Sequence, residues 1–468
     1  MTKIHCPVFL YRIGCVLLLA MAACAVPAAD GLTVLAGATV FDASGAGPVK
    51  NAVVVIRGDT IVDIGPGDRV PVPAGSTVHD VRGKWIVPGL VDAHVHFFQS
   101  GGLYTRPDVI DLRRIRPYAV EIAELREHLP ATLERYVASG VTSVVDLAGP
   151  DWVLDLRRLA SNLPAAPRLS ISGPGLAPYL PEGLDGEDAP AVVVHTPAQA
   201  RAAVQRLSDR RPDIIKIWFV PRPDMDLERE FRWVQAAVDE AHALDLRVAA
   251  HATQLDIARR MVTAGTDMLV HSVDDRLIDD ALLEQLRSNQ VLYIPTLGVS
   301  QRYAEVLGKQ LRLSGYERTL GDPAVIATLD DMAWLFPGRG RRVAIPDNTT
   351  ARENLLRVHQ AGITIAAGSD AGNIGTLHGP GLQRELELMV QAGLPPADVL
   401  IAATLGGAQV MGRSRELGRL APGYRADLLV LEGSPLRDIR NTRRITLVML
   451  DGRIVQCVPA QLSTVCSE

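Results

Sequence analysis

Eight short apolar runs alternate with longer amphipathic stretches through the middle of this 468-residue chain. Parallel strands that are buried on both faces read as continuous apolar runs, and covering helices read as amphipathic stretches such as 119–139 and 227–244. Eight strand–helix units predict an α/β fold in which a parallel (β/α)8 barrel, a TIM barrel, closes on itself. A doubly wound open sheet is the alternative, but no GxGxxG turn follows the first run. The runs are 90–96, 144–149, 169–173, 214–219, 247–251, 268–271, 291–297 and 364–369.

The two ends of the chain have a different pattern, with short strands broken by Gly, Pro and Asp. Runs at 52–56 and 60–64 flank the turn signal Arg57-Gly58-Asp59, and similar runs lie at 426–431 and 445–450. Because chain ends usually lie close together, we expect these segments to pair into one small β-sandwich. The predicted domains are residues 30–88 and 413–468 for the β-sandwich and residues 89–412 for the barrel. Within the long interval 298–362, we expect residues 337–342 to form an exposed loop.

The first 29 residues predict a signal peptide. Lys3 and Arg12 precede an uncharged apolar run of 11 residues, 13–23, and small residues follow it. A run of this length is too short to cross a bilayer, which takes about 20 residues, and it fits the apolar region of a secretory signal. We therefore expect an exported protein, periplasmic or secreted. A retained membrane anchor is one alternative, and a lipid anchor at Cys24 is another, because Met21-Ala22-Ala23-Cys24 resembles a lipobox.

Composition narrows the classes of partner. Hydrophobic residues make up 47% and charged residues 22%, which excludes a mainly disordered chain and a coiled coil. The net charge of −5, without a block of basic residues, argues against nucleic acid and leaves a small-molecule substrate. The oligomeric state stays open, and a homo-oligomer is compatible with the sequence. If the leader and Cys24 are removed, Cys457 and Cys466 remain and can pair in an oxidising compartment.

Polar residues stand at five of the eight predicted strands, where TIM barrels carry their reactive groups. On a strand, residues two apart point to the same side, so two histidines of the first run can face one ion. A lysine in the middle of the fourth run needs a partner carboxylate, a depressed pKa or conversion to a carbamate, because a buried ammonium ion is costly. Imidazole and carboxylate ligands suit zinc, with manganese, iron or cobalt as alternatives. The residues are His94, His96, Lys216, His251, His271 and Asp370.

These residues, together with Val87-Pro-Gly-Leu-Val-Asp-Ala-His-Val-His96, resemble the amidohydrolase superfamily, in particular its imidazolonepropionase-like and Xaa-Pro dipeptidase-like group. The tail Gly418-Arg-Leu-Ala-Pro-Gly-Tyr-Arg-Ala-Asp-Leu-Leu-Val-Leu431 resembles the return of that family into its β-sandwich. The resemblance implies two divalent metal ions, with zinc as the expected metal. It implies that His94, His96 and Asp370 hold the buried ion, that His251 and His271 hold the more exposed ion, and that a carboxylated Lys216 bridges the two.

The resemblance also implies the reaction, hydrolysis of a C–N bond in an amide or peptide such as an Xaa-Pro dipeptide or an N-acyl amino acid. A hydroxide that bridges the metals would attack the carbonyl carbon, and Asp370 would act as general base and then general acid. His378, just past Asp370, and Tyr293, on the seventh run, are candidate substrate contacts.

Other reactions remain open at this stage. The same two-metal site supports hydrolysis of a lactone, a phosphotriester or a cyclic amide, and no motif excludes them. Single-metal deaminases usually carry His-x-x-Glu after the fifth strand, whereas His251 is followed here by Ala252-Thr253-Gln254. A non-catalytic binding protein that kept the barrel would be expected to lack a metal ligand, and all six ligands are present.

Overall fold

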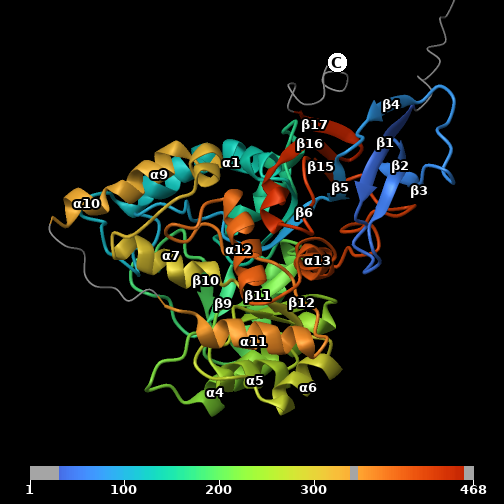
Figure 1. The fold of residues 1–468 in the computed structure, drawn as a ribbon. Helices are drawn as coiled ribbons and strands as arrows, with labels where there is room; N and C mark the ends of the chain where they lie inside the picture. Colours follow the sequence, from blue (N-terminus) through green and yellow to red (C-terminus); the bar gives the residue numbers. More distant parts are fainter. Residues whose placement is uncertain (1–30, 338–345, 458–468) are drawn as a thin grey trace, which may run out of the picture.

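The computed structural model describes residues 31–337 and 346–457. The predicted signal peptide, Cys24, Cys466 and most of the predicted loop 337–342 therefore lie outside the described residues, as does the side chain of Cys457. In Figure 1 a β-rich part, with blue and red strands side by side, stands beside a larger part that mixes helices and strands. Within the described ranges, no helix combines the length and apolar character needed to cross a membrane.

Seven regular strands and one irregular run form the barrel. The regular strands are all parallel: β6 (Leu90–Val95), β7 (Val141–Asp146), β8 (Arg168–Ile171), β11 (Ile214–Ile217), β12 (Arg247–His251), β13 (Met268–Val270) and β14 (Leu292–Ile294). The eighth run, 364–367, closes the ring through single backbone bonds. Ala366 N–H donates to the carbonyl of Tyr293, and Ala93 N–H donates to the carbonyl of Ala367. The predicted fold class is confirmed.

Two short strands and most of the helices surround this ring. Strands β9 (Gly175–Ala177) and β10 (Ala191–Val193) extend the sheet beside β11. Some covering helices begin at a side-chain cap; Thr196 and Gln199 form a capping box at one start, and Asp226 caps another. They are α1 (Tyr118–Ala138), α2 (Leu156–Ser161), α3 (Pro197–Asp209), α4 (Leu227–Ala243), α5 (Leu255–Thr263), α6 (Asp280–Ser288), α11 (Thr349–Gln360), α12 (Pro380–Gln391), α13 (Pro396–Ile401) and α14 (Gly407–Val410).

The long interval after the seventh strand contains more structure than the sequence pattern indicated. It holds α7 (Gly298–Leu307), α8 (Gly315–Leu320), α9 (Pro323–Asp330) and α10 (Met332–Leu335) before α11. Buried apolar residues of this segment pack with Leu103 and Leu377 in a cluster of their own, beside the segments that follow the first and eighth strands. The interval therefore forms a helical wall on one side of the barrel opening.

Strands from both ends of the chain form one sheet, as predicted. Its order is β17-β16-β15-β5-β1-β2-β3, with β4 beside β1, and β5 pairs antiparallel with β15. Leu35, Val54, Leu428 and Leu447 pack in its separate core. The strands are β1 (Leu32–Val40), β2 (Val49–Arg57), β3 (Thr60–Pro66), β4 (Thr77–Asp80), β5 (Trp85–Pro88), β15 (Leu428–Leu431), β16 (Ile445–Leu450) and β17 (Arg453–Cys457). Because only Gly89 separates β5 from β6, this sheet also fixes where the first barrel strand begins.

Candidate metal centre

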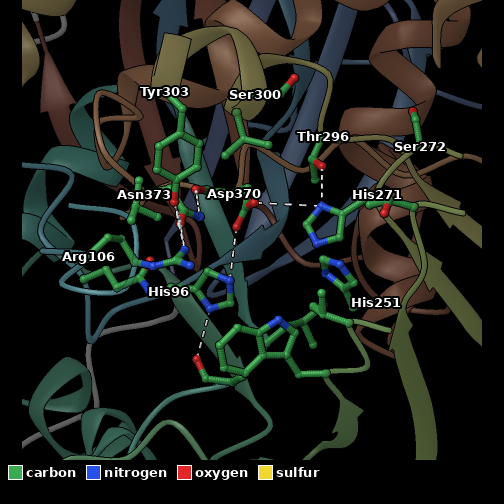
Figure 2. A pocket seen from close by; sticks show the side chains of 18 of the residues that line it. His96, Arg106, His251, His271, Ser272, Thr296, Ser300, Tyr303, Asp370 and Asn373 are labelled. Carbon is green, nitrogen blue, oxygen red and sulfur yellow. Dashed lines mark hydrogen bonds and ion pairs between the residues drawn. The ribbon is translucent and has the colours of Figure 1, made fainter. Parts of the chain in front are cut away.

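A cavity of about 440 Å³ opens at the carboxyl ends of the barrel strands. Five of the six predicted ligands line it. Four of them, His96, His251, His271 and Asp370, stand at or beyond the ends of different strands (Figure 2), and Lys216 lies within β11. His94 is fully buried and is not among the residues that line the cavity. The structure thus brings all six residues together from five strands that are far apart in the sequence. The five lining residues are His96, Lys216, His251, His271 and Asp370.

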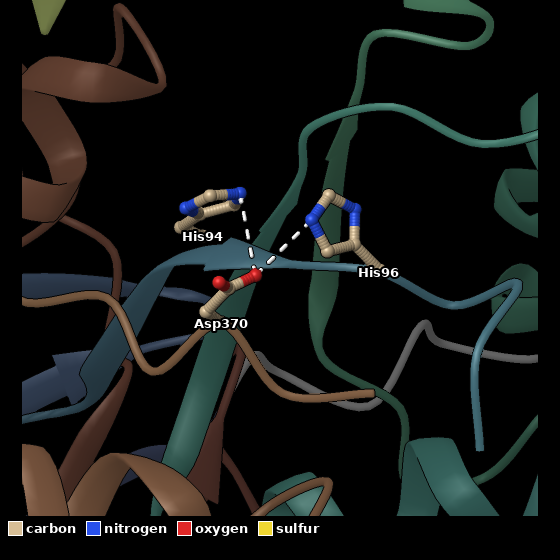
Figure 3. A group of neighbouring side chains, drawn as sticks. All are labelled: His94, His96 and Asp370. Atoms are coloured by element: carbon tan, nitrogen blue, oxygen red, sulfur yellow. Dashed lines mark ion pairs between the residues drawn. The ribbon is translucent and has the colours of Figure 1, made fainter. Parts of the chain in front are cut away.

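His94, His96 and Asp370 form the tightest group (Figure 3). Asp370 Oδ1 lies 3.1 Å from Nε2 of His96 and 3.7 Å from Nε2 of His94. The Nδ1 atom of His96 lies 3.0 Å from the carbonyl oxygen of Ala148, which only accepts, so Nδ1 carries a proton. A proton or a metal ion between Nε2 and the carboxylate oxygen would satisfy both atoms. The pair is therefore arranged as two ligands of one metal ion can be.

His251 and His271 form the second group of ligands. Their ring centroids are 4.4 Å apart, and the ring of His271 is 5.0 Å from that of His94. Burial is the main cause that lowers the pKa of His94 and His251 well below the usual value, and it lowers the pKa of His271 to about 3. These imidazoles are therefore neutral at neutral pH, which is the form that binds a metal ion.

Lys216 lies in β11 with 2% of its surface exposed. Its Nζ atom has no hydrogen-bond partner within the described part of the chain, so the partner carboxylate that the sequence left open is not found there. Burial lowers the pKa of Lys216 to about 7, although the charge of Asp370 acts in the opposite direction. A large fraction of the amine is thus neutral at neutral pH. Both nitrogens of His94 likewise lack a partner among the described residues.

The backbone around the cavity is held in conformations that side chains usually avoid. Ala148, His271, Thr296 and Asp370 have φ angles of 96°, 76°, 44° and 58°, in or near the left-handed region. Such residues typically cost about 1–3 kcal/mol each and cluster at functional sites. A Cβ atom at Gly368 would lie 2.9 Å from Cβ of His94, so this glycine lets the eighth run approach the first strand.

Two buried hydrogen bonds tie the first strand to the eighth run. Asp92 accepts a hydrogen bond of 2.8 Å from the backbone N–H of Ser369 and one of 2.6 Å from its hydroxyl. Burial raises the pKa of Asp92 to about 7 despite these bonds. Because Asp92 and Ser369 are sequence neighbours of the ligands His94 and Asp370, the pair sets the distance between the two halves of the predicted buried metal site.

The two residues predicted as substrate contacts lie outside the cavity. His378 is buried with both ring nitrogens engaged, Nδ1 at 2.8 Å from the hydroxyl of Tyr136 and Nε2 at 2.7 Å from the carbonyl oxygen of Gln99. Tyr293 is fully buried in β14, and its hydroxyl accepts a hydrogen bond from Val273 N–H. Neither side chain is among the residues that line the cavity, so the geometry does not support these two substrate contacts, and they stay predictions.

The structure adds three polar residues that the sequence did not single out. Arg106, from the segment after β6, donates through Nη1 to the hydroxyl of Tyr303 at 2.8 Å and to Oδ1 of Asn373. Tyr303, from α7, also donates to Oδ1 of Asn373. All three line the cavity next to Asp370 (Figure 2). A carboxylate or imidazole at a strand end is a recognisable signal, whereas these residues come from loops and a wall helix with no periodic pattern.

The donor set fits divalent metal ions. His94, His96 and Asp370 each offer one ligand atom, and these atoms all lie within 4.8 Å of one another. The unpartnered His94 nitrogens, the unpartnered Lys216 amine and the facing acceptors of His96 and Asp370 are all explained if cations belong there. Nitrogen and oxygen ligands of this kind suit zinc and other first-row metals.

Comparison with known proteins agrees with this geometry. The pattern of the amidohydrolase family matches residues 85–455. Imidazolonepropionase from Deinococcus deserti is 27% identical over 390 residues, which cover 80% of this chain and 84% of the relative. The crystal structure of a putative prolidase from Bifidobacterium longum is 27% identical, with a TM-score of 0.67 and coverage of 91% of this chain and 94% of that one. Phenylurea hydrolase B, 21% identical with a TM-score of 0.69, covers 93% of this chain and 98% of its own and shares the fold.

The family pattern covers most of the chain, from β5 through the barrel to β17. It therefore includes every strand that contributes a ligand, and it confirms the resemblance drawn from the sequence. This chain belongs to the amidohydrolase family and is a metal-dependent hydrolase that acts on carbon–nitrogen bonds.

Proposed function

We propose that this chain is a binuclear hydrolase that cleaves an amide-type C–N bond in a small molecule, with Asp370 as the group that transfers the proton. The observation that carries the proposal is the set of buried groups that lack partners, with Lys216 near the two histidine groups. His94, His96 and Asp370 would hold one ion, His251 and His271 the other. Such ions, with zinc as the proposed metal, supply a Lewis acid and a hydroxide nucleophile at neutral pH.

Asp370 has the properties of a general base. Burial alone would raise its pKa, but the nearby His94, His96 and His271 bring the net pKa well below the usual value, so it is a carboxylate at neutral pH. Its Oδ2 atom lies 3.8 Å from Nδ1 of His271, and Asp370 lines the cavity in which a substrate would bind. In this position it can take a proton from the attacking nucleophile and deliver it to the leaving amine.

Lys216 is proposed to carry a carboxyl group. A carbamate forms from a neutral amine and carbon dioxide, and the depressed pKa of Lys216 supplies the neutral amine. The amine nitrogen forms a bond to the carbon of carbon dioxide and releases one proton to solvent. The resulting anion has two oxygen atoms and would replace an unpartnered buried amine by a ligand for two cations. This reading accounts for a lysine in the middle of an apolar strand, where an ammonium ion has no counter-ion in contact.

Metal analysis of Lys216 variants tests the proposal. We expect close to two divalent ions per wild-type chain, loss of activity on chelation, and weak binding of both ions by Lys216→Ala. Added acetate or propionate should partly restore the activity of Lys216→Ala, because a small carboxylate can replace the carbamate. The matched control is Lys216→Arg, which no acid should rescue, since its fixed positive charge fills the gap.

The outcomes separate the alternatives. If Lys216→Ala keeps full metal content and near-normal turnover, the lysine is structural and the bridging role is wrong. If fully active wild-type protein contains one ion or none, the binuclear site is wrong. The assay itself begins with a screen of zinc-loaded protein against Xaa-Pro dipeptides, N-acyl amino acids and their uncharged amide analogues.

A further inference from the structure

Arg106 is the cation on the cavity wall that does not belong to the proposed metal site. Its side chain is 15% exposed and lies beside Asp370, Tyr303 and Asn373 (Figure 2). The other basic groups that line the cavity, within the described residues, are Lys216 and the histidines already assigned as ligands. The planar guanidinium of an arginine matches a carboxylate through two parallel N–H donors, so Arg106 has the chemistry to bind an acidic substrate group.

In this chain the carboxylate on Arg106 is supplied by the protein. Asp108 accepts from Nε of Arg106 at 2.8 Å and from Nη2 at 2.6 Å, which is the paired geometry that a bound carboxylate would adopt. The remaining Nη1 group donates to Tyr303 and Asn373. Four of about five N–H donors of the guanidinium are thus used within the chain.

The rest of the wall favours an uncharged group. The side chain of Asp108 is only 8% exposed, so water screens its charge poorly against an incoming anion. Asp274 adds a third carboxylate to the cavity lining, beside Asp108 and Asp370, and Phe98, Tyr179 and Trp218 provide aromatic surface. A substrate carboxylate at Arg106 would therefore have to displace Asp108 or accept repulsion from it.

We propose that Asp108 and Arg106 together form a specificity determinant that excludes substrates with a free carboxylate at this wall. This inference rests on the proposed hydrolase function. Among the amides that such a hydrolase could cleave, the pair would favour uncharged amides over N-acyl amino acids and dipeptides. Asp108 is the residue that sets the selectivity, because it takes the two N–H groups that an acidic substrate would need.

Matched substrate pairs test the selectivity. Each pair has one acyl group joined to proline or to pyrrolidine, so that the two members differ only in the carboxylate. For wild-type protein we expect kcat/KM at least 10-fold higher for the pyrrolidine member. Asp108→Asn, and Asp108→Ser as a second variant in case the first folds poorly, should shift this ratio at least 10-fold toward the acid. Asp274→Asn removes a carboxylate that lines the same cavity, and Asp274 forms no hydrogen bond or ion pair with Arg106 within the described part of the chain. This variant should shift the ratio less than 3-fold.

Binding to metal-free protein provides a readout that does not depend on catalysis. Calorimetry with N-acetylproline should show at least 10-fold tighter binding to Asp108→Asn than to wild type, and Arg106→Gln in the same chain should remove the gain. The proposal is overturned if wild type prefers the acidic member of the pairs, or if Asp108→Asn changes neither the ratio nor the binding. If no pair is hydrolysed by any variant, the proposed function fails, while the binding measurement still decides the role of Asp108.

Discussion

Asn373 links the cavity wall to the backbone of Asp370, and its loss should damage both metal binding and turnover. Its Nδ2 donates to the carbonyl oxygen of Asp370 at 3.1 Å, and its Oδ1 accepts from Arg106 and Tyr303. This orientation of the amide is the one that satisfies every partner, since a carbonyl only accepts. Asp370 itself has a φ of 58°, which a side chain rarely adopts without support.

The expected magnitude follows from these contacts. Asn373 is 2% exposed, so Asn373→Ala removes one buried and two partly buried hydrogen bonds and leaves Tyr303 and the Asp370 carbonyl with fewer partners. At about 0.5–1.5 kcal/mol for each bond, and more for groups left unsatisfied, the free energy of unfolding should fall by about 2–4 kcal/mol. A displacement of the proposed base by about 1 Å can reduce kcat by about 100-fold.

Three measurements on purified protein test this expectation: urea unfolding of the metal-free chain, metal content per chain, and kcat separately from KM. Asn373→Asp keeps an acceptor for Arg106 and Tyr303 but loses the donor to Asp370, so it should resemble Asn373→Ala in metal content and kcat. Tyr303→Phe is the matched control, because it leaves the bonds between Asn373 and Asp370 in place. We expect Tyr303→Phe to cost about 1–2 kcal/mol of stability while metal content stays close to wild type.

The reasoning fails if Asn373→Ala binds metal at the wild-type level and its kcat stays within 3-fold of wild type. Loss of stability with unchanged metal content would mean that Asn373 only supports the loop. If Asn373→Ala and Tyr303→Phe lower metal content and kcat equally, the effect comes from the contacts among Arg106, Tyr303 and Asn373 and not from the contact between Asn373 and Asp370.

Two further predictions concern pH and the N-terminus. Because folding lowers the pKa of Lys216 from 10.5 to about 7, the folded chain binds fewer protons than the unfolded chain across that range, so stability of the metal-free protein should rise with pH. The stabilising effect of Lys216→Met should therefore shrink by about 2 kcal/mol between pH 7 and pH 9 in urea unfolding, and a constant effect would show that Lys216 does not titrate there. We also propose that the protein is exported and cleaved before Asp30 or at Cys24. Mass spectrometry of the exported protein should show one of these two N-termini, with a lipid adduct on Cys24 in the second case. A chain that starts at Met1 would refute processing.

The sequence predicted the barrel well because its strands are buried on both faces. Helices expected at 119–139 and 227–244 are α1 and α4, displaced by a single residue at most at either end. The eighth run was also placed correctly, although it forms only single bridges in the structure. The spacing of hydrophobic residues along the sequence is enough to predict the positions of these strands and helices. The helices between Gly298 and Leu335 were not predicted, because they lie outside the barrel and no strands alternate with them in the sequence.

The candidate ligands could be predicted because a barrel places the ends of its strands in one volume. That rule says which residues meet, but not which way a neighbouring side chain points. The directions of Tyr293 and His378 could not be predicted for this reason: the Tyr293 hydroxyl accepts from Val273 N–H, and His378 is held between Tyr136 and Gln99. Side-chain direction in loops and at irregular strand ends depends on packing, which a periodic pattern does not record.

Arg106 joins two functions that mutation can separate. Through Asp108 it sets the charge of the wall that a substrate meets, and through Asn373 it supports the backbone of the proposed base. Asp108→Asn leaves the contacts of Asn373 untouched, so it should change the ratio between acidic and neutral substrates without lowering metal content. Asn373→Ala leaves the paired contact of Arg106 with Asp108, so it should lower metal content and kcat with little change in that ratio. The two variants therefore report on different contacts of one guanidinium, and a common effect of both would mean that the wall moves as a single unit.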